Sequence, residues 1–251
     1  MRRPLVAGNW KMHGSTAENA VLIEQLINGI DGRREGAEVV VCPPFVYLPE
    51  VVRRLKGTPV RVGAQNVSAE PGGAFTGEAS AAMLKDVGCE YVIVGHSERR
   101  AHYREDDAVI ARKFRAVLGQ GLVPILCVGE TLDEREAGST EAVVGRQLEA
   151  VLSLAGVASF ARAVVAYEPV WAIGTGKNAS PDQAQAVHRF IRDRIATGDA
   201  KIAGDLRIVY GGSVKAGNAA ELFAQPDVDG GLVGGASLKG DEFLEICAAA
   251  G

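Results

Sequence analysis

Eight short runs of apolar, often β-branched residues recur along the 251-residue chain, at intervals that average about thirty residues, the size of one strand-plus-helix unit. Most of the runs are continuously apolar, as in VVVC and YVIVG, and do not alternate between apolar and polar residues. Continuous apolar runs are typical of parallel strands that are buried on both faces. The eight predicted strands are Leu5 to Trp10, Glu38 to Cys42, Val60 to Gln65, Tyr91 to Gly95, Val123 to Val128, Ala163 to Glu168, Leu206 to Gly211 and Asp229 to Gly234.

The segments between these runs carry helix signals. Asp106 to Leu118 has apolar residues at helical spacing, Ser80 to Asp86 continues a face of Ala and Leu, and Ser180-Pro181 resembles an N-cap followed by proline. Strand and helix alternate along the sequence without a linker or a change of composition. Alternating strands and helices also form open doubly wound sheets, but eight such units without a change of composition favour a sheet that closes into a barrel. We therefore predict an α/β fold, a (β/α)8 barrel in which residues 1–251 form one domain.

Charge and cysteine content argue against several classes of partner. The net charge is −4 and no block of Lys or Arg stands apart from acidic residues, so a nucleic-acid surface is not expected. Four cysteines lie far apart, without C-x-x-C or a histidine at ligand spacing, which argues against a metal site and against disulfides. Reduced thiols predict a cytoplasmic protein. The first ten residues lack the apolar core of a secretion signal, and no run approaches a membrane span.

A glutamate stands at the end of the sixth predicted strand, where barrel enzymes place their chemistry. A lone Glu in such a position is more often a solvated surface acid. Here, however, Glu168 is followed by a proline, a Trp expected to be exposed, and the glycines Gly174 and Gly176, a composition that suits a hinged lid. Closure of a lid removes water and makes a carboxylate more basic. We therefore predict that Glu168 is a catalytic base.

A histidine follows the fourth predicted strand and precedes Ser97-Glu98-Arg99-Arg100, a plausible helix start. Backbone N–H groups at a helix start disfavour imidazolium, so His96 is expected to be a neutral ring that donates to a substrate oxygen, although a structural role is the alternative. His13, His102 and His188 lack this setting and are expected to be ordinary surface or packing residues.

Lys11 comes just after the first predicted strand, beside Asn9. It is expected either to stabilise developing negative charge or to act as a Schiff-base nucleophile, and a plain solvated lysine is the third possibility. Pairing with Glu98 would keep the ammonium protonated and so favours the electrostatic role.

Paired glycines follow the last two predicted strands, in Gly211-Gly212-Ser213 and in Gly234-Gly235-Ala236-Ser237. One pair alone would usually be a turn. Two pairs on consecutive units, together with Gly174 of the lid, favour a phosphate held by backbone N–H groups.

Seven segments in this order resemble the triosephosphate isomerase family over essentially the whole chain: GNWK, AQNVSAEPGGAFTGE, GHSERR, CVGE, AYEPVWAIGTGK, YGGSV and LVGGASL. The stretch from Ala166 to Lys177 is highly specific. The resemblance implies an aldose-ketose isomerase of glycolysis and gluconeogenesis, without a cofactor or metal, that interconverts dihydroxyacetone phosphate and D-glyceraldehyde 3-phosphate through an enediol or enediolate. This family is a standard example of carboxylate and neutral-histidine chemistry beneath a closing lid.

The resemblance also implies a role for each site residue. Glu168 would move the proton between C1 and C2, and His96 would shuttle protons between the oxygens. The other implied roles are substrate and oxyanion binding by Asn9 and Lys11, orientation of Lys11 by Glu98, phosphate binding by Gly174, Ser213, Gly234 and Gly235, and apolar cover of the carboxylate by Ile173 and Leu232.

A long polar loop, Gln65 to Glu78, follows the third predicted strand. From the residues alone it could be a free surface excursion. The resemblance implies an interlocking loop of a C2 homodimer, in which Thr76 approaches Asn9 and His96 of the partner subunit.

Two departures from the family pattern are small: His13 stands where Asn is frequent, and Lys177-Asn178-Ala179 is a variant second hinge of the lid. Cys127 is expected to be a packing residue, because no nearby base is indicated. Two other functions stay open, an aldolase-like phosphosugar barrel that uses Lys11 as a Schiff base, and a catalytically silent barrel that binds partners.

Overall fold

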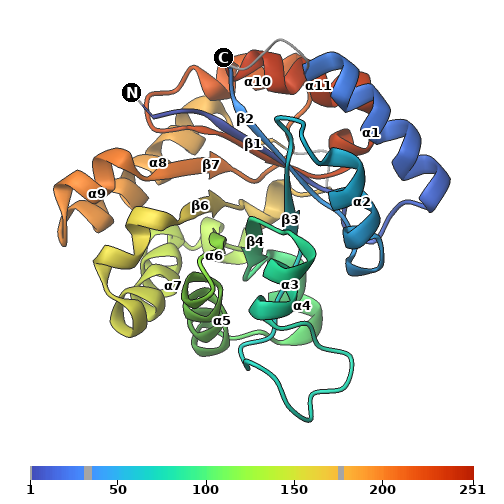
Figure 1. Ribbon diagram of the computed structural model, residues 1–251. Helices are drawn as coiled ribbons and strands as arrows, with labels where there is room; N and C mark the ends of the chain where they lie inside the picture. The colour runs from blue at the N-terminus through green and yellow to red at the C-terminus, as the bar shows by residue number, and fades with distance from the viewer. Residues whose placement is uncertain (1, 31–35, 175–177) are drawn as a thin grey trace.

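The computed structural model describes residues 2–30, 36–174 and 178–251, and their eight strands form a closed parallel barrel in the order β1 to β8 (Figure 1). Strand β1 pairs with β2 on one side and with β8 on the other, which closes the sheet. The predicted barrel is therefore confirmed. The strands are β1 Leu5–Asn9, β2 Glu38–Cys42, β3 Arg61–Ala64, β4 Tyr91–Val94, β5 Val123–Val128, β6 Val164–Tyr167, β7 Arg207–Tyr210 and β8 Gly230–Val233.

Helices surround the sheet on its outside (Figure 1). The α-helices are α1 Thr16–Ile30, α2 Leu48–Leu55, α3 Ala81–Val87, α4 Ser97–Tyr103, α5 Asp107–Gly119, α6 Leu132–Glu136, α7 Thr140–Ala155, α8 Pro181–Ala196, α9 Ala200–Asp205, α10 Ala216–Phe223 and α11 Gly240–Ala249. Short 3-10 turns are η1 Phe45–Tyr47, η2 Val157–Arg162, η3 Val170–Ala172 and η4 Gly235–Leu238. No helix in the described part of the chain is long and apolar enough to cross a membrane.

Side chains that cap the helices explain where several of them begin. Ser180 and Gln183 exchange hydrogen bonds in a capping box, and Pro181 takes the first helical position of α8, as the sequence predicts. Ser80 and Asp106 likewise accept N–H groups of the first turns of α3 and α5. Both residues are N-caps, so these two helices begin one residue later than the sequence predicts.

Successive side chains of each strand point alternately into and out of the barrel, so the buried apolar residues form two layers. On β4, Tyr91 and Ile93 belong to a cluster inside the barrel, whereas Val92 and Val94 pack with the helices outside. Both layers are apolar, which is why the strands read as continuous apolar runs. The inner cluster contains Leu5, Ala7, Val40, Cys42, Tyr91, Ile93, Ile125, Cys127, Val164, Ala166, Val209 and Leu232.

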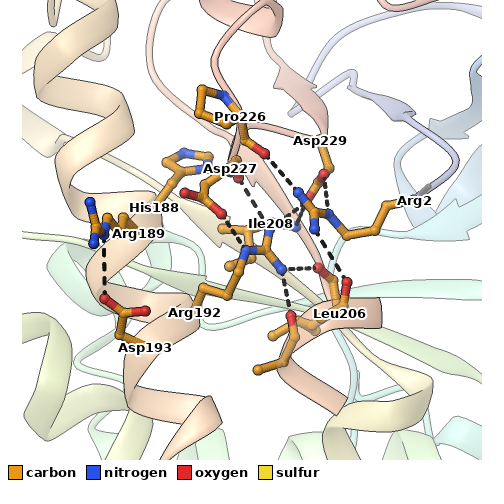
Figure 2. Close-up of polar contacts among 12 residues, drawn as sticks. Arg2, His188, Arg189, Arg192, Asp193, Leu206, Ile208, Pro226, Asp227 and Asp229 are labelled. Carbon is orange, nitrogen blue, oxygen red and sulfur yellow. Dashed lines mark hydrogen bonds and ion pairs between the residues drawn. The ribbon is translucent and has the colours of Figure 1, made fainter. Parts of the chain in front are cut away.

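Ion pairs join segments near the amino ends of β1, β7 and β8, the end of the barrel opposite the predicted site (Figure 2). Arg192 of α8 reaches Asp227 at 2.5 Å and Asp229 at 2.9 Å. Arg2 bonds the other oxygen of Asp229 at 2.6 Å, and the N–H of Ile208 donates to Asp229. The start of the chain is thereby tied to β7, β8 and α8.

Candidate active site

The carboxyl ends of the strands surround a cavity of about 260 Å³, and most of the predicted site residues line it. Asn9 and Lys11 come from the end of β1, His96 from the end of β4, and Leu232 from β8. Nine of the predicted residues line the cavity: Asn9, Lys11, His96, Ile173, Gly174, Ser213, Leu232, Gly234 and Gly235. Glu168 and Glu98 lie next to it through contacts with His96 and Lys11, whereas Thr76 is exposed on the separate loop after β3.

Glu168 is almost fully buried, with 2% of its surface exposed, and both carboxylate oxygens are engaged. Oε1 lies 2.8 Å from Nε2 of His96, and Oε2 accepts the backbone N–H of Ser97 at 2.9 Å. Burial raises the pKa of Glu168, but His96, the Ser97 N–H and the Cys127 thiol outweigh burial and hold the pKa below its ordinary value. In this arrangement the carboxylate is ionised and is not yet a strong base.

The thiol of Cys127 is fully buried inside the barrel beside Glu168. Burial and the neighbouring carboxylate raise the pKa of Cys127, so the thiol stays protonated and donates to Glu168.

Ser97 is a functional residue that the sequence argument missed. Its N–H and its hydroxyl, at 3.4 Å, both face Glu168, because Ser97 is the first residue of α4 and its N–H has no partner within the helix. The sequence offered one indication of this role, since Ser97 directly follows His96 at a predicted helix start, where a backbone N–H is left free to bind an anion.

His96 is the N-cap of α4, and its two ring nitrogens have different partners. Nδ1 accepts the backbone N–H of Glu98 at 3.2 Å, which requires this nitrogen to be unprotonated, so Nε2 carries the hydrogen toward Glu168. Burial lowers the pKa of His96, but the Glu168 and Glu98 carboxylates together raise it by more, so the pKa is above its ordinary value. If Glu168 moves away, burial and the helix start both favour the neutral ring.

Lys11 has a strained backbone, with φ of 51°, which is uncommon for a residue other than glycine. Asn9 Oδ1 accepts the N–H of Lys11 at 3.0 Å, and Gln65 donates to its carbonyl at 2.8 Å. These two bonds hold the turn, and the ammonium pairs with Glu98 at 2.5 Å. Lys11 thus lines the cavity with its side chain held by an ion pair.

Glu130 holds the first part of the predicted lid and was also missed. It is fully buried after β5, where its Oε1 accepts from the Tyr167 hydroxyl and from Trp171 Nε1, each at 3.0 Å. Arg135 bonds the same oxygen and stacks on the Trp171 ring. The expectation of an exposed Trp was therefore wrong, because Trp171 is partly buried by these contacts. The lid residues Thr175, Gly176 and Lys177 lie outside the described residues.

Gly129 is required where the loop after β5 passes the backbone of Glu168. A Cβ on Gly129 would lie 1.7 Å from the Glu168 carbonyl oxygen, closer than any real contact. Gln147 of α7 fixes this loop through two hydrogen bonds with the backbone of Gly129.

The glycine pairs line the same cavity, close to the acid-base groups: a Cβ on Gly211 would lie 2.9 Å from Cγ of Glu168, and one on Gly234 would lie 3.4 Å from Cε of Lys11. A Cβ on Gly212 would meet the Tyr210 hydroxyl at 2.2 Å, so glycine is needed for packing there, whereas Gly235 has open space in front of it. Charged side chains in the lining also come from Lys215, Lys239 and Glu242. In the described residues no group of three His, Cys, Asp or Glu side chains could hold a metal ion.

The chain resembles characterised proteins over nearly its whole length. The family model described as triosephosphate isomerase matches residues 4–250. Proteins named triosephosphate isomerase from Thiobacillus denitrificans and Dechloromonas aromatica are 64% and 60% identical to the chain over 250 residues, and the alignments cover 100% of this chain and 99% and 100% of the relatives. The one from Pseudomonas putida is 57% identical over 252 residues, with full coverage of both chains. The chain therefore belongs to the triosephosphate isomerase family.

Proposed function

We propose that this chain interconverts dihydroxyacetone phosphate and D-glyceraldehyde 3-phosphate by proton transfer through an enediol or enediolate, in glycolysis and gluconeogenesis. The observation that carries the proposal is one cavity that is lined both by His96 and Lys11 and by the glycine turns after β7 and β8, with Glu168 in contact with His96.

In this mechanism the Glu168 carboxylate takes a proton from C1 and returns it at C2. The substrate oxygens replace Glu168 as the partner of the His96 Nε2–H, so the carboxylate is released to face the carbon acid. Glu168 then loses its contacts with Ser97 and His96, which lower its pKa in the structure described. Ile173 and Leu232 cover the site and exclude water, which raises the pKa of Glu168 further. The base becomes stronger only when substrate is bound.

Negative charge that develops on the substrate oxygens is stabilised by two groups. His96 donates from Nε2 as a neutral ring and can pass protons between the two oxygens, and Lys11 and Asn9 line the same cavity. Backbone N–H groups of Gly174, Ser213, Gly234 and Gly235 bind the phosphate. Phosphate binding drives closure and so lowers the barrier at a distant carbon.

The Schiff-base alternative is less well supported. A nucleophilic lysine needs an amine that is free to attack a carbonyl carbon, whereas Nζ of Lys11 is held in an ion pair 2.5 Å from the Glu98 carboxylate. Borohydride reduction in the presence of substrate separates the two reactions, because an isomerase forms no covalent adduct for borohydride to trap.

The direct test is a coupled isomerase assay on the wild type beside Glu168→Asp. Shortening the carboxylate by one methylene moves it away from the carbon acid while its charge is kept, so we expect a rate loss of about a hundredfold or more with an unchanged fold. Equal rates in the two proteins would remove Glu168 from the role of base, and an inactive wild type would leave the silent-barrel alternative in its place.

We also propose that the chain works as a single-domain protein of the cytoplasm and forms a C2 homodimer. The loop Gln65 to Glu78 extends beyond the ring of helices (Figure 1), and Thr76 on it would approach Asn9 and His96 of the partner subunit. Beside the site a second cavity of about 270 Å³ opens, with Phe45, Glu98 and Tyr103 in its lining. Exposed Met12, Phe45 and Tyr103 supply apolar surface in its lining, and Phe75 is exposed on the loop itself. Sedimentation of the active enzyme as a monomer would contradict this dimer.

A further inference from the structure

An ion pair lines the cavity just after the glycine turn that follows β8. Lys239 follows η4 and is the N-cap of α11, and Glu242 lies in the first turn of that helix. The ammonium of Lys239 is 3.4 Å from Oε2 of Glu242, and both residues line the cavity. Among the described residues that line it, Glu242 is the only carboxylate.

A phosphate dianion at the glycine turns needs positive charge nearby, because the backbone N–H groups of the turns are dipoles without net charge. Lys11 supplies part of this charge, since a Cβ on Gly234 would lie 4.0 Å from its Nζ, but the same ammonium also pairs with Glu98 at 2.5 Å. Glu242 repels a dianion that enters the same cavity. Lys239 and Lys215 are the remaining cations in the described lining, and both are exposed.

The Lys239 ammonium is held loosely enough to change partner. Its separation from Glu242 is 0.9 Å longer than that of the Lys11 pair, as 3.4 Å exceeds 2.5 Å, and its side chain is 76% exposed against 26% for Lys11. Exposed ion pairs of this kind are weak, and a lysine side chain has a flexible four-carbon stem. A dianion can therefore draw the ammonium away from Glu242 at small cost.

We propose that Lys239 and Glu242 set the strength with which this cavity binds a phosphate dianion: the ammonium attracts the dianion, and the carboxylate opposes it and restrains the ammonium. This inference rests on the proposed function, because it assigns the phosphate of the substrate to the glycine turns of this cavity. The pair determines affinity and specificity for a doubly charged ligand and takes no part in proton transfer.

Two substitutions test the inference, one that removes the positive charge of Lys239 and one that removes the negative charge of Glu242. In Lys239→Met, KM for D-glyceraldehyde 3-phosphate and the inhibition constant of inorganic phosphate should rise about three- to tenfold at low salt, with kcat within twofold of the wild type. In Glu242→Gln both constants should fall. Added salt should shrink both differences, and Lys239→Arg should restore the wild-type constants. Turnover of glycolaldehyde, which has no phosphate, should not change in either variant.

Two matched controls change charge elsewhere. Lys201→Met on α9 and Glu245→Gln on α11 alter the net charge equally but lie outside the cavity lining, so neither should move the phosphate inhibition constant by more than twofold. If Lys239→Met and Glu242→Gln behave like these controls while the wild type is an active isomerase, the inference is wrong and the proposed function stands. A wild type without isomerase activity would instead remove the proposed function, and this inference with it.

Discussion

Single residues around Glu168 decide how strongly the carboxylate holds its charge. Three donors, from His96, Ser97 and Cys127, offset the effect of burial in the arrangement described, so the pKa of Glu168 lies below its ordinary value. The structure therefore accounts for a base that is ionised before substrate arrives, and substrate binding must remove donors to make it basic.

Replacing Ser97 with proline tests the contribution of one backbone N–H. Proline is tolerated at the first position of a helix, and His96 before it has φ of −51° and ψ of 140°, which a residue before proline can adopt. Loss of the N–H removes a bond that favours the carboxylate, so the pKa of Glu168 should rise. The acidic limb of the kcat/KM pH profile should move to higher pH.

Ser97→Ala is the matched control, because it removes the hydroxyl but keeps the N–H. Its acidic limb should stay close to that of the wild type, since the hydroxyl contact is long at 3.4 Å. Identical pH profiles for the proline and alanine variants would show that the N–H does not set the pKa of Glu168.

Gly129→Ala tests the close approach of two backbones. The new Cβ would lie 1.7 Å from the Glu168 carbonyl oxygen, so the loop after β5 must shift and carry Glu168 with it. We expect a loss of about 3 kcal/mol in the free energy of unfolding, measured by urea denaturation, and a large loss of kcat. Gly217→Ala on α10, where the space is open, should have little effect on either. Equal stability of the two variants would contradict the geometry around Gly129.

The sequence singles out the residues that we propose carry the chemistry, but not those that hold them in place. Glu168, His96 and Lys11 could be proposed because each ends or follows an apolar run and bears a reactive group. Ser97, Gly129 and Glu130 were not, because their roles depend on contacts with residues that are distant in the chain. Only folding brings the Ser97 N–H to Glu168, 71 positions away. The ends of the strands, in contrast, were predicted to within one residue, because burial on both faces leaves a local pattern.

At the scale of elements, the lid segment is held at its beginning by the loop after β5. Glu130 joins Tyr167 at the end of β6 to Trp171 in η3, so the start of the lid is tied to the barrel. Pro169 restricts φ just before this anchor. Movement of the lid must therefore occur beyond Trp171, around Ile173 and Gly174, or must break the contacts with Glu130.

Deleting residues 173–177 tests whether this segment protects the intermediate. Without cover, an enediolate meets water and can eliminate phosphate, so isomerisation should fall by about a thousandfold or more while methylglyoxal formation rises. Both products can be measured in the same reaction. Unchanged turnover in the deletion variant would contradict the role given to the lid.

For the whole molecule, stability at acid pH should depend on a histidine far from the chemistry. His188 of α8 is completely buried beside Tyr167 and Tyr210, and its Nδ1 lies 3.1 Å from the Asp227 carbonyl oxygen. Burial lowers the pKa of His188 to about 4. The unfolded chain therefore binds this proton more readily than the folded protein does.

Stability should fall as the pH drops from about 6.5 toward about 4, because His188 stays neutral in the folded state but is protonated in the unfolded state. The contribution amounts to about 3 kcal/mol, fully present above pH 6.5 and lost at pH 4. Burial raises the pKa of Asp227, but Gln185 and Arg192 lower it by more. Protonation of Asp227 at still lower pH breaks its ion pair with Arg192 and lowers the free energy of unfolding further. Urea unfolding of wild type and His188→Gln across this range measures the difference in slope, with exposed His102→Gln as the control. Parallel curves for wild type and His188→Gln would refute this account of acid sensitivity.

The most direct test of the central claim follows the C1 proton itself. In deuterated water, the wild type should exchange the C1 proton of dihydroxyacetone phosphate with solvent during turnover, and Glu168→Gln should lose this exchange by about a thousandfold or more while it keeps its affinity for inorganic phosphate. Exchange in the glutamine variant at the wild-type rate would contradict the assignment of Glu168 as the base.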